Sequence, residues 1–342
     1  MTAQVAFLFP GQGSQAAGMG ADVFEASPAA RRVFESADEA LGISLSTICF
    51  QGPDDVLRET INTQPAIVTV SLALLAALQE VLTEHTSSWS SPLIPNYIAG
   101  HSVGEYAALV ASDALHMQDA VRLVRERGRL MHHEGTICPG SMAAVIGMDA
   151  EVLQDVCRDA TSQSIPIQGA ASHPGQGQVS VANFNAPGQI VISGEQGALN
   201  LAMEMAKARG AKRVIPLSVS GAFHSPVMQP AAEGLARAVA GCEVYDATIP
   251  IIGNIHATPL AEAQAIREEL TQQIAAPVEW IRTIEYMVHA GVTIFLEIGP
   301  GQALTGMVKR IAKGVVTLNV SCKTDIEKVV GTIREIGLVD EV

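Results

Sequence analysis

The pentapeptide GHSVG at residues 100–104 constrains the fold of this chain more than any other segment. An apolar stretch, residues 97–99, runs into it, and a series of helix-forming residues, 105–111, follows it. The spacing G-x-S-x-G between a strand and a helix is typical of a sharp turn that exposes its serine, with glycines that let strand and helix approach closely. The N–H groups of the new helix then point at whatever the serine attacks. The segment predicts an α/β fold with Ser102 as a nucleophile; an ordinary turn is the alternative.

The composition limits the functions that such a fold could serve. The 342 residues are 48% hydrophobic but only 4% aromatic, which predicts an aliphatic core in one large domain or in a domain with an insertion. A net charge of −14 argues against a nucleic-acid partner. The five cysteines are odd in number and form no C-x-x-C pair, so we expect reduced thiols in the cytoplasm, without a disulfide frame or a metal site.

The apolar segments of the chain do not predict a membrane span. The first residues lack the basic region of a signal peptide, and the apolar run after them ends at Pro10. The longest apolar region, residues 66–82, is interrupted by polar residues and is better interpreted as a buried helix. The polar residues 83–95 are expected to form a surface loop after that helix.

A glycine-rich loop at residues 11–15 follows the first predicted strand, residues 5–9. It has neither the Gly-Lys-Ser/Thr of a Walker A loop nor the G-x-G-x-x-G fingerprint of a dinucleotide site. We therefore expect no nucleotide cofactor at this loop.

The pattern changes between residues 138 and 217, where the order of predicted elements is β-α-β-β-α-β. This is the ferredoxin-like unit, and we expect it to be a subdomain inserted into an α/β body formed by residues 1–137 and 218–342. The predicted strands are 142–148, 179–183, 189–193 and 213–219, and the predicted helices are 150–160 and 199–209. The body resumes with strands at 292–298 and 315–320 and helices at 303–311 and 325–336.

A serine nucleophile needs a base, and His224 is the candidate among the nine histidines. It lies in a loop of small residues, 220–226, directly after a predicted strand, and loops at strand ends are where α/β proteins place catalytic groups. The side chain of His101 is expected to leave the turn in another direction, and the other histidines are expected at surfaces or element edges. No acidic third member is evident between Ser102 and His224, which argues against a lipase or esterase.

Arg127 falls inside the apolar stripe of a predicted helix that runs through residues 120–131. A guanidinium on a buried face needs an anionic partner, because an unpaired buried charge costs several kcal/mol or more. Two interpretations are open at this point. One is an internal salt bridge to Asp or Glu, and the other is a fork that grips the carboxylate of a substrate.

An oxyanion hole needs two backbone donors. The N–H of Val103, directly after the nucleophile, is one candidate. Gln12, in the glycine-rich loop, is the candidate for the other, with a simple tight turn as the alternative for that loop.

With these residues in place, the chain closely resembles the malonyl-CoA:acyl carrier protein transacylases and the related acyltransferase domains of polyketide synthases. The resemblance covers nearly the whole chain and rests on several motifs in the same order. They are FPGQGSQ at 9–15, GHSVGEYAAL at 100–109, RGRLM at 127–131, VANFNAPGQIVISG at 181–194, GAFHSP at 221–226 and EIGPG at 297–301.

The resemblance implies a reaction and a fold. The family fold is an α/β-hydrolase-like body with a parallel sheet and an inserted ferredoxin-like subdomain. The implied reaction passes a malonyl group from malonyl-CoA through Ser102 to the phosphopantetheine thiol of an acyl carrier protein, for fatty acid or polyketide synthesis, without a cofactor. His224 resembles the general base, and Arg127 the arginine that binds the malonyl carboxylate.

The resemblance also assigns supporting residues. Gln12 and Val103 match the oxyanion donors, and Gln273 matches a glutamine whose backbone carbonyl orients the histidine. Asn183 and Asn185 match asparagines near the mouth of the site.

Phe223, directly before the histidine, bears on the choice of acyl group. A bulky residue at this place goes with malonyl in the superfamily and a smaller one with methylmalonyl, so malonyl is the expected group. Excluding one methyl is worth only about 1–3 kcal/mol, so partial discrimination is expected.

Docking of an acidic carrier protein onto an acidic chain needs a local basic patch. Two candidates are residues 207–213 and the group Lys309, Arg310 and Lys313, with ordinary solvated helix ends as the alternative. The stretches 83–95 and 161–178 resemble surface insertions that could alter this docking.

Two rival functions are a serine hydrolase or acyl-thioesterase and a non-catalytic carrier-binding module. The module would be expected to have lost Ser102 or His224, and both are present. These motifs select neither the pathway nor an oligomeric state.

Overall fold

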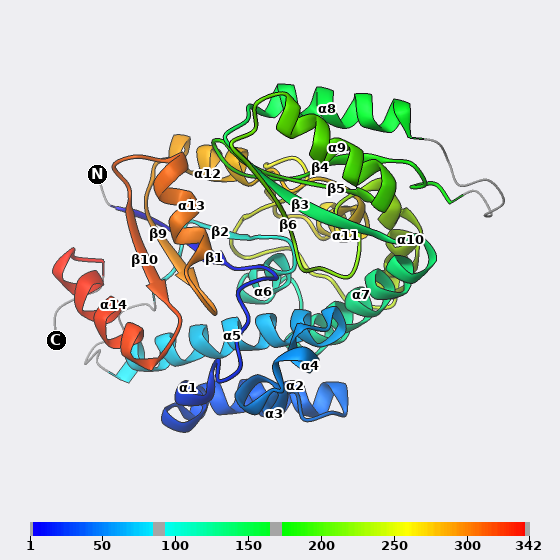
Figure 1. Ribbon diagram of the computed structural model, residues 1–342. Helices are drawn as coiled ribbons and strands as arrows, with labels where there is room; N and C mark the ends of the chain where they lie inside the picture. The colour runs from blue at the N-terminus through cyan, green and yellow to red at the C-terminus, as the bar shows by residue number, and fades with distance from the viewer. Residues whose placement is uncertain (1–2, 85–92, 165–172, 339–342) are drawn as a thin grey trace.

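The computed structural model describes residues 3–84, 93–164 and 173–338, and it places two sheets side by side (Figure 1). The larger sheet has six strands in the order β10-β9-β1-β2-β7-β8. All its pairings are parallel except that of β7 with β8, so the expected parallel sheet carries one antiparallel strand at its edge. The strands are β1 (Gln4–Phe9), β2 (Tyr97–Gly100), β7 (Ile251–Ile252), β8 (Pro259–Leu260), β9 (Val292–Ile298) and β10 (Val316–Val320).

Helices cover this sheet, and the long helix α5 (Thr60–Glu84) crosses beneath it in Figure 1. Helices α1 to α4 lie on the far side of α5: α1 (Ala21–Ala26), α2 (Pro28–Leu41), α3 (Leu45–Gln51) and α4 (Asp54–Arg58). Around the rest of the sheet are α6 (Gly104–Ala111), α7 (Met117–Ile137), α10 (Gln229–Ala240), α11 (Ala263–Gln272), α12 (Trp280–His289), α13 (Ala303–Ile311) and α14 (Lys323–Glu335). Two short 3-10 turns, η1 (Pro226–Met228) and η2 (Gln273–Ala275), complete the body.

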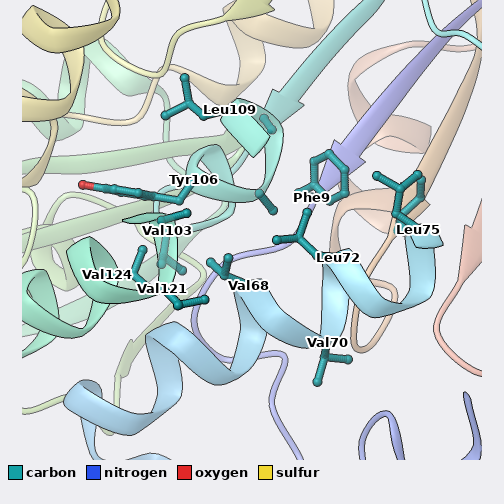
Figure 2. Close-up of a cluster of buried hydrophobic side chains, with 14 of the residues drawn as sticks. Phe9, Val68, Val70, Leu72, Leu75, Val103, Tyr106, Leu109, Val121 and Val124 are labelled. Carbon is teal, nitrogen blue, oxygen red and sulfur yellow. The ribbon is translucent and has the colours of Figure 1, made fainter. Parts of the chain in front are cut away.

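The core beside the nucleophile is mostly aliphatic, as the composition predicts. Figure 2 shows a cluster of buried side chains from β1, α5, α6 and α7 that includes Val103, the residue after Ser102. Val68 and Leu72 of α5 face this cluster, whereas Val70 points to the opposite side of the same helix. Because α5 is buried on both sides, its apolar character is that of a core helix. Its segment Thr60–Thr83 is long and apolar enough to cross a membrane, but 72% of its apolar 18-residue window is buried inside the protein.

The second sheet has four antiparallel strands in the order β4-β5-β3-β6. The strands are β3 (Gly140–Ile146), β4 (Val179–Ala186), β5 (Gln189–Glu195) and β6 (Arg213–Pro216), and helices α8 (Ala150–Gln163) and α9 (Gln196–Ala208) pack on them. The predicted order β-α-β-β-α-β is the observed one, and the sheet has its own hydrophobic cluster. The boundaries at residues 138 and 217 stay a prediction.

Several predicted element ends, and one residue of a predicted loop, differ from the structure. Strand β4 extends to Ala186 instead of ending at 183, so that Asn185 belongs to the strand rather than to the turn after it. Strand β6 ends at Pro216 instead of 219. Leu93, inside the predicted surface loop, is buried in the main core, because one apolar side chain in a polar stretch suffices to anchor it.

The smaller sheet is joined to the body along β4, through a segment between η2 and α12. The N–H of Phe184 donates to the carbonyl of Val278 at 2.9 Å, and the N–H of Val278 donates to the carbonyl of Ala182 at 2.8 Å. This short parallel pairing fixes β4 against the body, at the place where the candidate site lies.

Candidate active site

Ser102 occupies a strained turn between β2 and α6. Its φ of 52° lies in the left-handed region, which residues other than glycine rarely adopt. The glycines on both sides have no room for a side chain: a Cβ on Gly100 would lie 2.0 Å from the carbonyl carbon of Gly104, and a Cβ on Gly104 would lie 2.2 Å from the carbonyl oxygen of Phe9. The turn predicted from the pentapeptide is therefore present, and close backbone approach explains both glycines.

His224 lies beside the serine, as predicted. Its Nε2 is 2.7 Å from Ser102 Oγ. Its Nδ1 is 3.0 Å from the backbone carbonyls of both Gln273 and Ala276, which can only accept a hydrogen bond, so the proton sits on Nδ1 and Nε2 is the free base. Two carbonyls thus take the orienting place that an aspartate has in other serine enzymes, in line with the absence of an acidic third member in the sequence.

The surroundings of His224 keep it neutral. Burial lowers the pKa of its imidazole to about 3, and the positive charge of Arg127 acts in the same direction. A neutral imidazole is the form that can accept the serine proton.

Arg127 is 1% exposed and reaches the nucleophile from α7. Its Nη1 donates to Oε1 of Gln64 at 2.8 Å, and its Nη2 donates to Oε1 of Gln273 at 2.9 Å and to Ser102 Oγ at 3.1 Å. All three acceptors are uncharged, and within the described residues no Asp or Glu lies at salt-bridge distance from this guanidinium. The alternative of an internal salt bridge is therefore wrong, and the charge stays available to an anion beside Ser102.

Gln64 was missed by the sequence reasoning. It is a buried amide on α5, a helix whose other inward positions are mostly apolar. An isolated glutamine in the apolar stripe of a core helix is the signal that could have found it.

These groups line a cavity of about 490 Å³ between the two sheets. Its lining combines the polar side chains of the site with apolar ones, as is typical of a binding pocket. The apolar lining residues are Val103, Met131, Met142, Val191, Leu217, Val219, Phe223, Ala303, Leu304 and Met307. Phe223 is 4% exposed and takes part in this lining, as its place before the histidine predicts.

The two predicted oxyanion donors both line the cavity. In the part of the chain that is described, neither the N–H of Val103 nor the N–H of Gln12 has a hydrogen-bond partner. The side chain of Gln12 is held away from its backbone by a hydrogen bond of 3.4 Å to Thr60 Oγ1. An oxyanion hole requires two such N–H groups at one cavity. That Val103 and Gln12 form one stays a prediction.

Asn183 and Asn185 line the cavity from β4. Oδ1 of Asn185 lies 2.8 Å from Nε2 of His101, and the ring of His101 packs edge-on against Trp280 with 5.3 Å between the ring centres. His101 therefore turns away from the serine, as expected, and links the turn to the smaller sheet.

The two basic patches differ in their distance from the cavity. Lys309 lies on α13, the helix whose Ala303, Leu304 and Met307 line the cavity. Residues 207–213 run from the end of α9 into β6, and none of them lines the cavity. The next lining residue along the chain is Leu217. Of the predicted insertions, residues 85–92 and 165–172 lie outside the described residues.

Comparisons with known proteins all find acyl transferases. The family model described as "Acyl transferase domain" matches residues 6–336. The malonyl CoA-acyl carrier protein transacylase of Bacillus subtilis (strain 168) is 43% identical over 332 residues, which is 97% of this chain and 98% of that protein. The structure of the malonyl CoA-acyl carrier protein transacylase of Coxiella burnetii superposes with a TM-score of 0.87 at 35% identity, over 96% of this chain and 97% of that one.

A further similar structure is described as a type II PKS acyl-carrier protein in complex with its malonyl-transacylase. It superposes with a TM-score of 0.85 at 36% identity and covers 96% of this chain and 100% of that one.

Proposed function

Since the chain belongs to the acyl transferase domain family, we propose that it transfers malonyl groups from malonyl-CoA to the phosphopantetheine thiol of an acyl carrier protein. One observation carries the choice of malonyl. A buried guanidinium with only uncharged partners lies 3.1 Å from the nucleophilic oxygen, where an acyl group on Ser102 would place a second carboxylate.

The first half-reaction forms the acyl-enzyme. Ser102 Oγ attacks the thioester carbonyl of malonyl-CoA while Nε2 of His224 takes the hydroxyl proton. The oxyanion is stabilised by the N–H groups of Val103 and Gln12. As the C–S bond breaks, the proton on His224 passes to the departing CoA sulfur, and the malonyl ester of Ser102 remains.

The second half-reaction reverses these roles. The pantetheine thiol of the carrier protein gives its proton to His224 and attacks the ester carbonyl of the malonyl group. The same two N–H groups hold the second oxyanion. The bond from carbon to Ser102 Oγ then breaks, His224 returns the proton to that oxygen, and the malonyl thioester leaves on the carrier.

Arg127 selects the acyl group in this scheme. A guanidinium binds a carboxylate through two parallel hydrogen bonds, and the low polarity of the site strengthens them. Phe223 occupies space beside the acyl group that the α-methyl of methylmalonyl would need. Nucleophile, base and charge are all supplied by side chains, so the proposed cycle uses no metal and no cofactor.

We place the reaction in the cytoplasm, because the five cysteines are unpaired, as thiols in a reducing compartment would be. A serine hydrolase that releases the acyl group to water is the second candidate, since the same serine and histidine would serve it. It would accept monocarboxylic esters and would not need Arg127.

Mass spectrometry of the protein after mixing with malonyl-CoA tests the proposal. We expect a malonyl adduct that peptide mapping assigns to Ser102, and its discharge when carrier protein with phosphopantetheine is added. An adduct on Ser14 or on a cysteine contradicts the assignment of the nucleophile. Discharge to water at the same rate with and without carrier protein favours the hydrolase.

A further inference from the structure

The backbone of the nucleophile is held by a side chain that the mechanism above does not use. Asn254 is 1% exposed and lies two residues after β7. Its Oδ1 accepts the N–H of Ser102 at 2.7 Å, and its Nδ2 donates to the carbonyl of Gly100 at 2.8 Å. One amide therefore spans the turn and ties its two ends together.

Ser102 needs such support. A residue other than glycine in the left-handed region is strained by about 1–3 kcal/mol and keeps this conformation only where its surroundings impose it. The N–H of Ser102 is fixed by Asn254, and its carbonyl accepts a hydrogen bond from Nε2 of Gln273 at 3.1 Å. Both peptide groups of the nucleophile are thus bound by amide side chains from another part of the chain.

Glu105 orients the Asn254 amide. This carboxyl group follows the pentapeptide on α6, is 1% exposed, and accepts hydrogen bonds through Oε2 from both the N–H and Nδ2 of Asn254. An oxygen acceptor on that side requires the NH₂ of the amide to face Glu105, which leaves Oδ1 facing Ser102. The next N–H, that of Ile255, donates to the buried Glu269 at 2.9 Å, so two carboxyl groups anchor the same loop.

Burial raises the pKa of Glu105 well above that of an ordinary carboxyl group, and the proximity of Glu269 raises it further. A neutral carboxylic acid still accepts through one oxygen, so the orientation of Asn254 does not require a charge at Glu105.

We propose that Asn254, oriented by Glu105, is a positioning residue that holds Ser102 in its left-handed conformation with Oγ facing His224. It also occupies the N–H of Ser102, which leaves the oxyanion to the N–H groups of Val103 and Gln12. The inference rests on the proposed function only in taking Ser102 as the nucleophile.

The test compares the reactivity of Ser102 in the wild type with that in variants of Asn254 and of Glu105. Labelling by a fluorophosphonate probe measures the nucleophile without using malonyl recognition, and rapid-quench malonylation measures the natural step. We expect Asn254→Leu to slow both by about 100-fold, the effect of misplacing a reacting group by about 1 Å. The KM for malonyl-CoA should stay within about twofold, because Arg127 and Gln64 are untouched by the change.

Glu105 supplies the second set of variants. Glu105→Gln keeps an oxygen that accepts from Asn254, so it should label at close to the wild-type rate. Glu105→Leu removes the acceptor and should be slowed about as much as Asn254→Leu. Asn62→Leu is the matched control, because it also deletes a buried amide. Nδ2 of Asn62 donates to the carbonyl of Val56 at 3.0 Å and makes no contact with Ser102.

Labelling of folded Asn254→Leu at the wild-type rate overturns the proposal, and so does a Glu105→Gln protein as slow as Glu105→Leu. If the leucine variants do not fold, Asn254→Asp decides, since it keeps Oδ1 but loses both Nδ2 donors. It should label about tenfold more slowly, and a wild-type rate contradicts us. A wild type that labels but takes no malonyl refutes the proposed function and leaves the labelling comparison valid.

Discussion

Arg127 Nη2 donates a hydrogen bond of 3.1 Å to the oxygen of Ser102, so the group proposed to bind the substrate carboxylate contacts the nucleophile before any substrate is present. In the acyl-enzyme this oxygen becomes part of an ester, and the guanidinium can turn to the distal carboxylate. The same side chain therefore contacts the nucleophile before acylation and is proposed to bind the acyl group after it.

Arg127→Ala should lose malonyl transfer and keep or gain transfer of acetyl. Removing one member of a buried charge pair costs about 2–5 kcal/mol, so we expect kcat/KM for malonyl-CoA to fall at least about 30-fold. Arg129→Ala is the control on the same helix, since Arg129 is exposed and paired with Glu126 at 2.7 Å. Steady-state assays with both thioesters check this, and intact malonyl transfer in Arg127→Ala refutes the role of the fork.

Acylation should persist in mildly acidic solution. The neutral form of His224 is the base, and burial lowers its pKa to about 3, so the acid limb of kcat/KM should lie below pH 6.5, the value of an ordinary histidine. Binding of a malonyl carboxylate neutralises Arg127, the second cause of the shift, so the limb of kcat should lie at higher pH than that of kcat/KM. Single-turnover acylation from pH 4.5 to 8 measures the acid limb of kcat/KM. A limb near pH 6.5 contradicts the lowered pKa of His224.

The same histidine affects stability with a definite sign. Its pKa is lower in the folded than in the unfolded chain, so the unfolded chain binds the extra proton between pH 3 and 6.5 and stability falls as the pH drops through that window. His224→Gln should show a smaller loss of melting temperature between pH 7 and pH 5 than the wild type. Equal losses in the two proteins indicate that His224 is not buried as described.

Phe223→Val should relax the choice of acyl group. The smaller side chain frees space for one methyl, and such a difference is worth about 1–3 kcal/mol, so the ratio of kcat/KM for methylmalonyl-CoA to that for malonyl-CoA should rise about tenfold. Phe50→Val, in the aromatic cluster of α3 with Phe24 and Phe34, is the control for a general loss of packing. An unchanged ratio in Phe223→Val refutes the assignment.

Charge reversal should separate the two basic patches. Lys309 follows the cavity-lining Met307 on α13, so Lys309→Glu should raise KM for the carrier protein without changing KM for malonyl-CoA. The pair Lys212→Glu and Arg213→Glu tests the patch at residues 207–213 in the same assay. The effects should shrink at high salt, and a change in KM for malonyl-CoA argues against a role in docking.

A methyl group on the turn should abolish the site. Gly100→Ala would bring its Cβ within 2.0 Å of the Gly104 backbone, so we expect no labelling of Ser102 and a severe loss of folded protein. Gly331→Ala in α14 has open space around its added methyl and should stabilise the fold by about 0.5–1 kcal/mol. Thermal unfolding of both variants provides the measurement, and a stable, reactive Gly100→Ala contradicts the account of the turn.

The parts of the site that could be predicted are those with a local signal. The strand, turn and helix around Ser102 form one continuous segment, and Arg127 interrupts an apolar stripe that the sequence displays directly. The element order of the smaller sheet is also local, because its strands and helices follow one another directly along the chain.

The parts that escaped prediction depend on tertiary contacts. Asn254 lies 152 residues from Ser102 along the chain and follows a strand of two residues, too short for any periodicity to reveal. Strand β8 is equally short, which is why the antiparallel edge was not foreseen. The side chain of Gln273, which bridges Arg127 and the carbonyl of Ser102, has no signature beyond its neighbours.

The uncharged partners of Arg127 also affect the relative stability of the empty protein and the acyl-enzyme. A buried cation that has no carboxylate at salt-bridge distance among the described residues destabilises the unloaded chain, whereas the malonyl ester of Ser102 would bring an anion beside it. Acylation would then tighten the fold as well as store the acyl group. Stability of the chain would then depend on its place in the catalytic cycle, with the malonylated protein melting at a higher temperature than the empty one.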